Sequence, residues 1–266
     1  MTSDRDSLSP LPPDDPSRTA TADADEHKSL PLWQETILLL AIALALAVLI
    51  KALLVQAFFI PSESMEPGLL VNDRILVQKP SYWGSGGPQR GDVIVFDDPG
   101  GWLNGLESAQ PMSFLARGLA KIGLYPTGGH LVKRVIGVAG DTIVCCDEDG
   151  RITVNGEAID ESDFIEPQKD PPKSCDGPMP SGQMDCNWTA GPVPPGTVFV
   201  MGDNRDNSAD SSVHLCRPNA TSCDESDAYV PVKDVVGKVF ALAWPLSRAH
   251  IVHTPDAFDD VPDPAQ

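Results

Sequence analysis

The distribution of apolar and polar positions divides the chain into distinct parts. Residues 1–30 are rich in Asp, Ser, Pro and Thr, whereas residues 36–55 are almost entirely apolar. From residue 57 onward, short apolar stretches alternate with clusters of turn residues, and residues 255–266 are again polar and acidic. The two polar ends bury too little apolar surface to offset their chain entropy, so both are predicted to be disordered.

The apolar segment is predicted to be a transmembrane helix inside an anchor that covers residues 31–56. Its 20 residues, at about 1.5 Å each, match a hydrocarbon core of roughly 30 Å. Its only charge, Lys51, lies near the far end, where the side chain can reach the interface. A cleaved secretory signal would start with positive charge and end at a small-residue cut site, and a buried core helix would carry regular polar positions. The segment shows neither pattern, which favours a membrane span.

Short strands are predicted throughout the body of the chain, residues 57–254. The stretches with strand patterns bounded mostly by turn residues are 73–79, 91–98, 130–138, 141–146, 151–156, 196–203 and 235–244. A hairpin with Asp149-Gly150 at its turn is predicted within 145–156. Residues 99–129 and 160–195 carry no strand signal, although the first stretch contains a candidate amphipathic helix, SFLARGLAKIGL.

The charge balance limits the classes of partner. The chain has 19 Lys+Arg against 38 Asp+Glu, a formal net charge of −19. An acidic surface repels phosphate backbones, which argues against nucleic-acid binding. The same charge gives no attraction to an anionic membrane surface, so attachment to a bilayer must come from apolar burial.

All six cysteines follow the apolar segment. Their spacing matches no zinc signature, so no metal and no cofactor are predicted. An even number in a loop-rich region suits disulfides, with Cys216–Cys223 and Cys175–Cys186 favoured as short pairings, while reduced buried thiols are the alternative. The few basic residues before the span give only a weak orientation signal. The cysteines therefore decide the expected orientation: disulfides favour an extracytoplasmic body and leave residues 1–30 as a cytoplasmic tail.

Candidate chemistry begins directly after the apolar segment. Ser62 and Ser64 lie between Pro61 and Pro67, and alternation along an extended backbone would put both on one side. A serine hydroxyl is a poor nucleophile until a base removes its proton. None of the five histidines is well placed to be that base, since each lies before the span, near the end of the chain, or without an orienting acid.

Lys133 is the alternative base, because it stands inside the predicted strand 130–138 among apolar neighbours. Neutralising a lysine of ordinary pKa at pH 7 costs about 4.6 kcal/mol, and burial lowers that cost by disfavouring the ammonium. An edge-strand lysine facing water is the bland alternative. A third segment, GDNRDNSADS, follows an apolar strand and is either a surface turn or a polar cluster that places Ser208 and Asp210 beside a buried cation.

The segments FFIPSESMEPGL, RGDVIVF, HLVKRVIGVAGD and GDNRDNSADS occur in this order behind an apolar anchor. They resemble the successive conserved boxes of bacterial type I signal peptidases, the Ser–Lys serine proteases of peptidase family S26. Any one box would be weak, but four linked boxes and an anchor, spread over residues 35–245, are specific.

The resemblance assigns roles to particular side chains. It implies that Ser64 is the nucleophile, Lys133 the general base, and Ser62 a donor to the oxyanion together with the Ser64 backbone N–H. It implies that Ser208 contacts the lysine and that Asp210 and Arg134 support the site, with Asp203 and Arg205 as structural residues. Positions that match the substrate pocket are Phe58, Ile60, Leu69 and Val132, for which plain core packing is the alternative.

The resemblance also implies fold and function. The expected fold is mostly β, an antiparallel catalytic core with a smaller inserted β region at 142–199, preceded by one transmembrane helix. The expected activity is removal of signal peptides from exported preproteins, after small residues, by a monomer anchored in the plasma membrane with its catalytic domain on the extracytoplasmic side. The expected partners are therefore preproteins and the lipid bilayer.

Some features depart from the family pattern. Ser212 stands where the family commonly has Arg, and residues 99–129 and 213–228 look like insertions. Two other classes of protein remain as alternatives. A self-cleaving repressor also uses a Ser–Lys pair, but it is cytosolic and carries DNA-binding helices. A membrane-tethered β domain that only binds partners would not need both Ser64 and Lys133.

Overall fold

The structure is a computed structural model that describes residues 31–84, 86–103, 129–165, 188–216 and 222–264. The chain separates into two units, Met1–Ala43 and Leu44–Gln266, and the boundary falls inside the one long helix, α1 (Leu32–Leu53). Leu and Ala dominate this helix and are among the strongest helix formers. Its first 19 residues, Leu32–Ile50, are long and apolar enough to cross a membrane, and none of them is buried within the protein.

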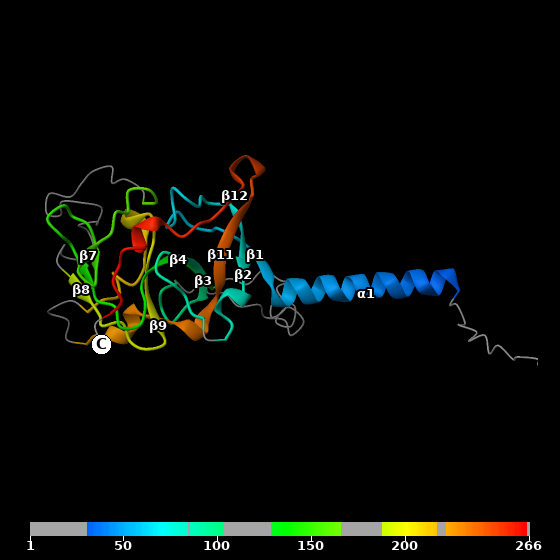
Figure 1. Ribbon diagram of the computed structural model, residues 1–266, viewed down its shortest axis with the longest axis horizontal. Helices are drawn as coiled ribbons and strands as arrows, with labels where there is room; N and C mark the ends of the chain where they lie inside the picture. The colour runs from blue at the N-terminus through cyan, green and yellow to red at the C-terminus, as the bar shows by residue number, and fades with distance from the viewer. Residues whose placement is uncertain (1–30, 85, 104–128, 166–187, 217–221, 265–266) are drawn as a thin grey trace, which may run out of the picture. The chain divides into compact units, whose positions relative to one another are not determined.

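The main sheet has eight strands, all in antiparallel pairs (Figure 1). Its order is β1-β2-β11-β3-β4-β9-β10, and β12 pairs with β11. The bounds are β1 (Val55–Phe59), β2 (Arg74–Gln78), β3 (Val93–Asp97), β4 (His130–Gly137), β9 (Thr197–Met201), β10 (Val230–Pro231), β11 (Val235–Trp244) and β12 (His250–Ile251). The predicted mostly β, antiparallel fold is confirmed.

Strand β11 lies between β2 and β3 in this order. It pairs with β2 on one side, where Val239 faces Val77, and with β3 on the other, where Gly237 faces Val95. The close approach explains the glycine, because a Cβ at Gly237 would lie 2.5 Å from the carbonyl oxygen of Gln78. The late strand β11 therefore joins two pairs of strands that come from much earlier in the sequence.

A second, four-stranded sheet has the order β7-β6-β5-β8. Its strands are β5 (Ile143–Cys145), β6 (Thr153–Val154), β7 (Glu157–Ala158) and β8 (Trp188–Ala190). The predicted hairpin is present, since β5 pairs with β6. A tighter hairpin that was not predicted joins β6 to β7 through Asn155-Gly156, whose φ angles of 53° and 86° are those a type I′ turn requires.

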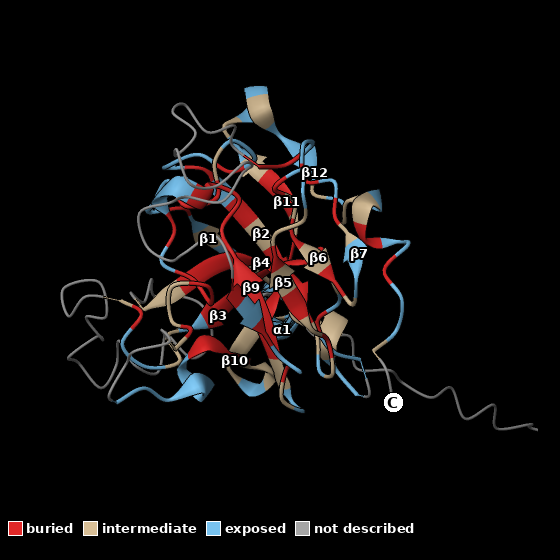
Figure 2. Cartoon of the chain, turned by 90° about the vertical axis from the view of Figure 1, so that its left-hand side faces the viewer, coloured by how far each residue is buried: buried red, intermediate tan, exposed pale blue. Residues whose placement is uncertain are grey.

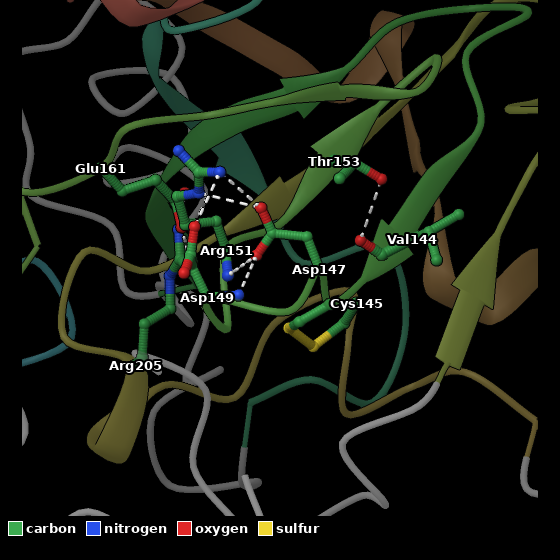
Figure 3. Close-up of a disulfide and its surroundings, with 9 residues drawn as sticks. Val144, Cys145, Asp147, Asp149, Arg151, Thr153, Glu161 and Arg205 are labelled. Carbon is green, nitrogen blue, oxygen red and sulfur yellow. Dashed lines mark hydrogen bonds and ion pairs between the residues drawn. A yellow bond between two sulfur atoms is a disulfide. The ribbon is translucent and has the colours of Figure 1, made fainter. Parts of the chain in front are cut away.

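The loop between β5 and β6 is held by one carboxylate. Asp147 accepts hydrogen bonds from the Arg151 side chain and from the backbone N–H groups of Asp149 and Arg151 (Figure 3). The same view shows a disulfide between the adjacent residues Cys145 and Cys146, a pairing that was not foreseen. Cys216 and Cys223 are also bonded, as favoured from the sequence, and Cys175 and Cys186 lie outside the described residues.

The core is formed by the inward faces of both sheets, and buried positions run along β4 and β9 (Figure 2). It consists of three clusters of buried apolar side chains, one centred on the second sheet and β9, one on β2 and β11, and one on β3 and the other face of β4. Short 3₁₀ turns lie between strands at Pro80–Tyr82, Arg205–Asn207, Glu225–Ala228, Val232–Asp234 and Leu246–Arg248, and another, Asp256–Phe258, follows β12.

Two predictions about residues 160–195 and the C-terminal segment were wrong. Residues 255–264 are not disordered, because Phe258 and Val261 are buried in the core and the carbonyls of Val261 and Pro262 accept hydrogen bonds from Arg90. Residues 160–195, expected to hold no strand, contain β8. The candidate amphipathic helix within 99–129 and the tail 1–30 lie outside the described residues.

Candidate active site

Ser64 lies in the short connection from β1 to β2. This connection leaves the sheet at Ile60, whose N–H still donates to the Asp73 carbonyl, and then bends and turns through residues 62–66. The extended backbone expected around Ser62 and Ser64 is therefore replaced by a turn. Ser64 is only 7% exposed, whereas Ser62 is exposed at the surface, and their hydroxyl oxygens are 3.3 Å apart.

Lys133 lies in the middle of β4 and is 3% exposed. The distance from its Nζ to Ser64 Oγ is 2.6 Å, a buried hydrogen bond between residues 69 positions apart. Burial lowers the pKa of Lys133 from 10.5 to about 8, against the opposing attraction of the nearby carboxylates Asp210 and Asp203. The edge-strand alternative is wrong, because β4 pairs with β3 on one side and β9 on the other. An amine with this pKa is partly neutral near pH 8 and can then accept a proton.

The loop after β9 forms hydrogen bonds with the backbone around Ser64. The Asn204 N–H donates to the Ser64 carbonyl at 3.1 Å, and its side-chain amide donates to the Glu63 carbonyl at 3.1 Å. Gly202 packs so closely against the Ser64 carbonyl that an added Cβ would lie 2.5 Å from its oxygen and 2.3 Å from Ser208 Oγ. The position of the serine backbone is therefore fixed by a neighbouring loop, which the sequence did not reveal.

Ser208 and Asp210 come together behind Lys133. Ser208 donates its hydroxyl to Asp210 Oδ2 at 2.5 Å, and the Gly202 N–H donates to the same oxygen at 2.9 Å. The hydrogen bond described for the Lys133 amine goes to Ser64. The contact expected between Ser208 and the lysine is thus not among the described hydrogen bonds, and Asp210 acts on Lys133 through its charge.

Two buried ion pairs involve residues close in sequence to Lys133 and Ser208. Arg134 makes two hydrogen bonds to Asp203, at 2.7 and 2.8 Å, and its guanidinium lies 4.3 Å from the centre of the Phe164 ring. Arg205 pairs with Glu161 (Figure 3). Both side chains are almost fully inaccessible to solvent. Glu161 was missed, because a lone acid in a polar stretch gives no sequence signal.

The four predicted pocket residues lie in one apolar cluster with Met65. Ile60, Leu69 and Val132 are buried members, and Phe58 packs against them while its ring meets the His130 ring edge-on at 5.1 Å. The cluster thus lies between the turn that carries Ser64 and the strand that carries Lys133. Among the described residues, no group of three or more His, Cys, Asp or Glu side chains is arranged to hold a metal ion.

Comparison with known proteins identifies the family. A family model described as signal peptidase, peptidase S26, matches residues 33–244. The chain belongs to peptidase family S26. This S26 member is 37% identical over 248 residues to the signal peptidase I of Mycobacterium tuberculosis strain H37Rv, covering 90% of this chain and 81% of the relative. The S26 chain is also 31% identical to signal peptidase I of Leptolyngbya laminosa, covering 97% and 100% of the two chains.

A crystal structure of a signal peptidase I from Enterococcus faecalis V583 matches less closely. It is 20% identical and covers 57% of this chain and 96% of its own, with a TM-score of 0.28, too low to compare the two folds. Family membership makes the protein a peptidase, and so a hydrolase. The predicted resemblance to bacterial type I signal peptidases is confirmed.

Proposed function

We propose that this S26 peptidase is a membrane-anchored serine endopeptidase that removes signal peptides from exported preproteins, with Ser64 as nucleophile and Lys133 as general base. The observation that carries the proposal is the buried 2.6 Å contact between Lys133 Nζ and Ser64 Oγ. The relatives named signal peptidase I support the class of substrate.

The reaction begins with neutral Lys133. In that state the hydrogen bond runs from the Ser64 hydroxyl to Nζ, and the amine takes the proton as Ser64 Oγ attacks the scissile carbonyl. The resulting ammonium then gives its proton to the leaving amine, and an acyl-enzyme forms on Ser64. Water, deprotonated by the same amine, attacks the acyl carbon and releases the product with the serine restored.

Stabilisation of the oxyanion is assigned to Ser62 and to the backbone N–H of Ser64. The 3.3 Å separation of the two hydroxyl oxygens puts the Ser62 hydroxyl close enough to reach an oxygen on the carbon bound to Ser64. One such donor contributes about 10²–10³-fold to kcat. Ser62→Ala is therefore expected to lose activity in that range.

Specificity is assigned to the apolar cluster beside the pair. Phe58, Ile60, Leu69 and Val132 belong to or pack against one apolar cluster, and an apolar lining suits small, uncharged residues before the cut. Phe58 is the one of the four that is not fully buried, so it is the side chain best placed to meet substrate.

The anchor and compartment follow the same proposal. Helix α1 would span the plasma membrane once, with the body on the extracytoplasmic side, where the disulfide Cys216–Cys223 is compatible with an oxidising environment. A single chain carries every residue named in the mechanism, which is consistent with a monomer. Anchoring would hold the site near substrates that are themselves embedded in the bilayer, raising their effective concentration.

Replacement of the two residues tests the proposal. Ser64→Ala and Lys133→Ala in the full chain, reconstituted in lipid vesicles, are expected to abolish cleavage of a preprotein with Ala before the cut. Matched controls are Ser247→Ala and Lys233→Ala, which change exposed residues and should leave cleavage unchanged. Full cleavage by Ser64→Ala would refute the mechanism, and failure of the wild type to cut any preprotein would favour a binding role.

A further inference from the structure

The carboxylate of Asp210 is held in an unusual way for a buried charge. It is 2% exposed, and both oxygens accept hydrogen bonds from neutral groups. Oδ2 accepts from the Gly202 N–H and the Ser208 hydroxyl, and Oδ1 accepts from the N–H of Ser212 at 3.1 Å and from its hydroxyl at 2.7 Å. One residue, Ser212, therefore supplies half of the donors to this carboxylate.

Lys133 and Arg205 interact with the charge of Asp210, but no salt bridge among the described residues joins either of them to it. Within the described ranges, Arg134 pairs with Asp203 and Arg205 pairs with Glu161. The salt bridges of the other arginines also go to carboxylates other than Asp210. The charged and titratable groups near Asp210 are Lys133 on β4 and, from the segment after β9, Asp203, Arg205 and His214. Asp203 and Arg205 in turn form ion pairs with Arg134 and Glu161. Asp210 thus receives its described hydrogen bonds from neutral groups, and it acts on Lys133 and Arg205 through its charge.

We propose that Ser212 is a positioning residue for the Ser64–Lys133 pair: by donating its hydroxyl to Asp210 it limits the negative potential at Lys133 and keeps the amine ready to accept the serine proton. This inference rests on the proposed function. Ser212 touches neither Lys133 nor Ser64 in the described contacts, so it acts through Asp210 alone.

The direction of the effect follows from the dipole. The hydrogen of the Ser212 hydroxyl points its positive end at the carboxylate, and this partly cancels the attraction of Asp210 for the Lys133 ammonium. Removing the hydroxyl leaves a more strongly negative carboxylate, which stabilises the ammonium. The base is then neutral only at higher pH.

Ser211 provides a matched control. It is fully buried, stands next to Ser212, and also uses its hydroxyl in a hydrogen bond, but as acceptor from the Val200 N–H at 2.9 Å. Ser211→Ala removes the same group from the same loop without touching Asp210. Any general loosening of the loop would therefore appear in both variants.

The test is the pH dependence of kcat/KM, measured in vesicles between pH 6 and 10 with a fluorogenic signal-peptide substrate that has Ala before the cut. Ser212→Ala is expected to raise the apparent pKa of the rising limb by about half a unit, which lowers kcat/KM about threefold at pH 7. Ser212→Thr, which keeps the hydroxyl, is expected to restore the wild-type profile, and Ser211→Ala to leave the apparent pKa in place.

Other outcomes are equally decisive. A Ser212→Ala profile that coincides with the wild type, or an equal shift in Ser211→Ala, would overturn the role of Ser212. If Ser212→Ala does not fold, Ser212→Cys replaces it in the test. Cysteine has nearly the same shape but is a weaker donor, so the apparent pKa of the rising limb should move upward by a smaller amount. Cleavage by Ser64→Ala would instead show that the proposed function itself is wrong.

Discussion

Gly202 offers a direct test of how tightly the serine backbone is held. Its Gly202→Ala variant adds one methyl group at a position where that carbon would lie 2.3 Å from Ser208 Oγ, 2.5 Å from the Ser64 carbonyl oxygen and 2.6 Å from Ser208 Cβ. No real Cβ contact is this short, so the serine turn or the Ser208 side chain must move. Ordinary contact begins near 3.4 Å, so the required displacement approaches 1 Å.

A displacement of that size has a known scale of effect. Misplacing a reacting group by about 1 Å costs roughly 10²-fold in rate, and overpacking of a buried site costs about 1–3 kcal/mol of stability. We therefore expect kcat/KM of Gly202→Ala to fall about 100-fold, with a folded protein that remains measurable. The assay combines preprotein cleavage with the thermal unfolding midpoint of the same preparation.

Two control glycines separate local from general effects. An alanine Cβ at Gly237 would clash with the Gln78 carbonyl at 2.5 Å, away from the serine, so Gly237→Ala should lose stability without a comparable loss of kcat/KM per folded molecule. Gly87 has nothing within 4 Å of the added carbon, and Gly87→Ala should change neither quantity. Wild-type kcat/KM in Gly202→Ala, or equal losses in Gly202→Ala and Gly237→Ala, would refute the reasoning.

Three further predictions concern charge and the end of the chain. Lys133→Met should be inactive yet more stable than wild type by about 3 kcal/mol at pH 7, because the pKa of Lys133 falls from 10.5 to about 8 on folding. Between pH 8 and 10.5 the unfolded wild type binds more protons than the folded one, so the stability of the wild type should rise with pH across this range. Urea titrations at several pH values should show that rise for the wild type and none for Lys133→Met. Glu161→Gln removes the carboxylate of the buried Arg205–Glu161 ion pair and should cost about 3–5 kcal/mol of stability by urea denaturation, and an unchanged midpoint would disprove the pairing. Phe258→Ala should cost about 3–5 kcal/mol of stability, whereas a truly disordered end would make it silent.

The local pattern of the sequence predicted most of the main sheet. Strands β2, β3, β4, β9 and β11 fall inside predicted stretches, because their apolar alternation and turn boundaries are properties of neighbouring residues. Strand β8 was missed because its three residues stand beside a Pro- and Cys-rich stretch, and its pairing with β5 is nonlocal. The short strands β10 and β12 have two residues each, too few to show any period.

The polar contacts of the site were harder to foresee. The resemblance pointed to Ser64 and Lys133, and the structure brings them within 2.6 Å. The resemblance gave no sign of Glu161. It also gave no sign that the Ser64 carbonyl packs against Gly202 and accepts a hydrogen bond from the Asn204 N–H, because such contacts depend on tertiary packing. The acidic composition of 255–266 suggested disorder, but burial of Phe258 and Val261 and the hydrogen bonds from Arg90 hold residues 255–264 against the core.

The place of β11 has a consequence for biosynthesis. The turn with Ser64 belongs to the β1-β2 side and Lys133 to the β3-β4 side, and β11 pairs with both β2 and β3. A nascent polypeptide that has not yet delivered residues 235–244 lacks the strand that joins these halves, and closing so long a loop is slow. The Ser64–Lys133 contact can therefore form only after residues 235–244 have been synthesised.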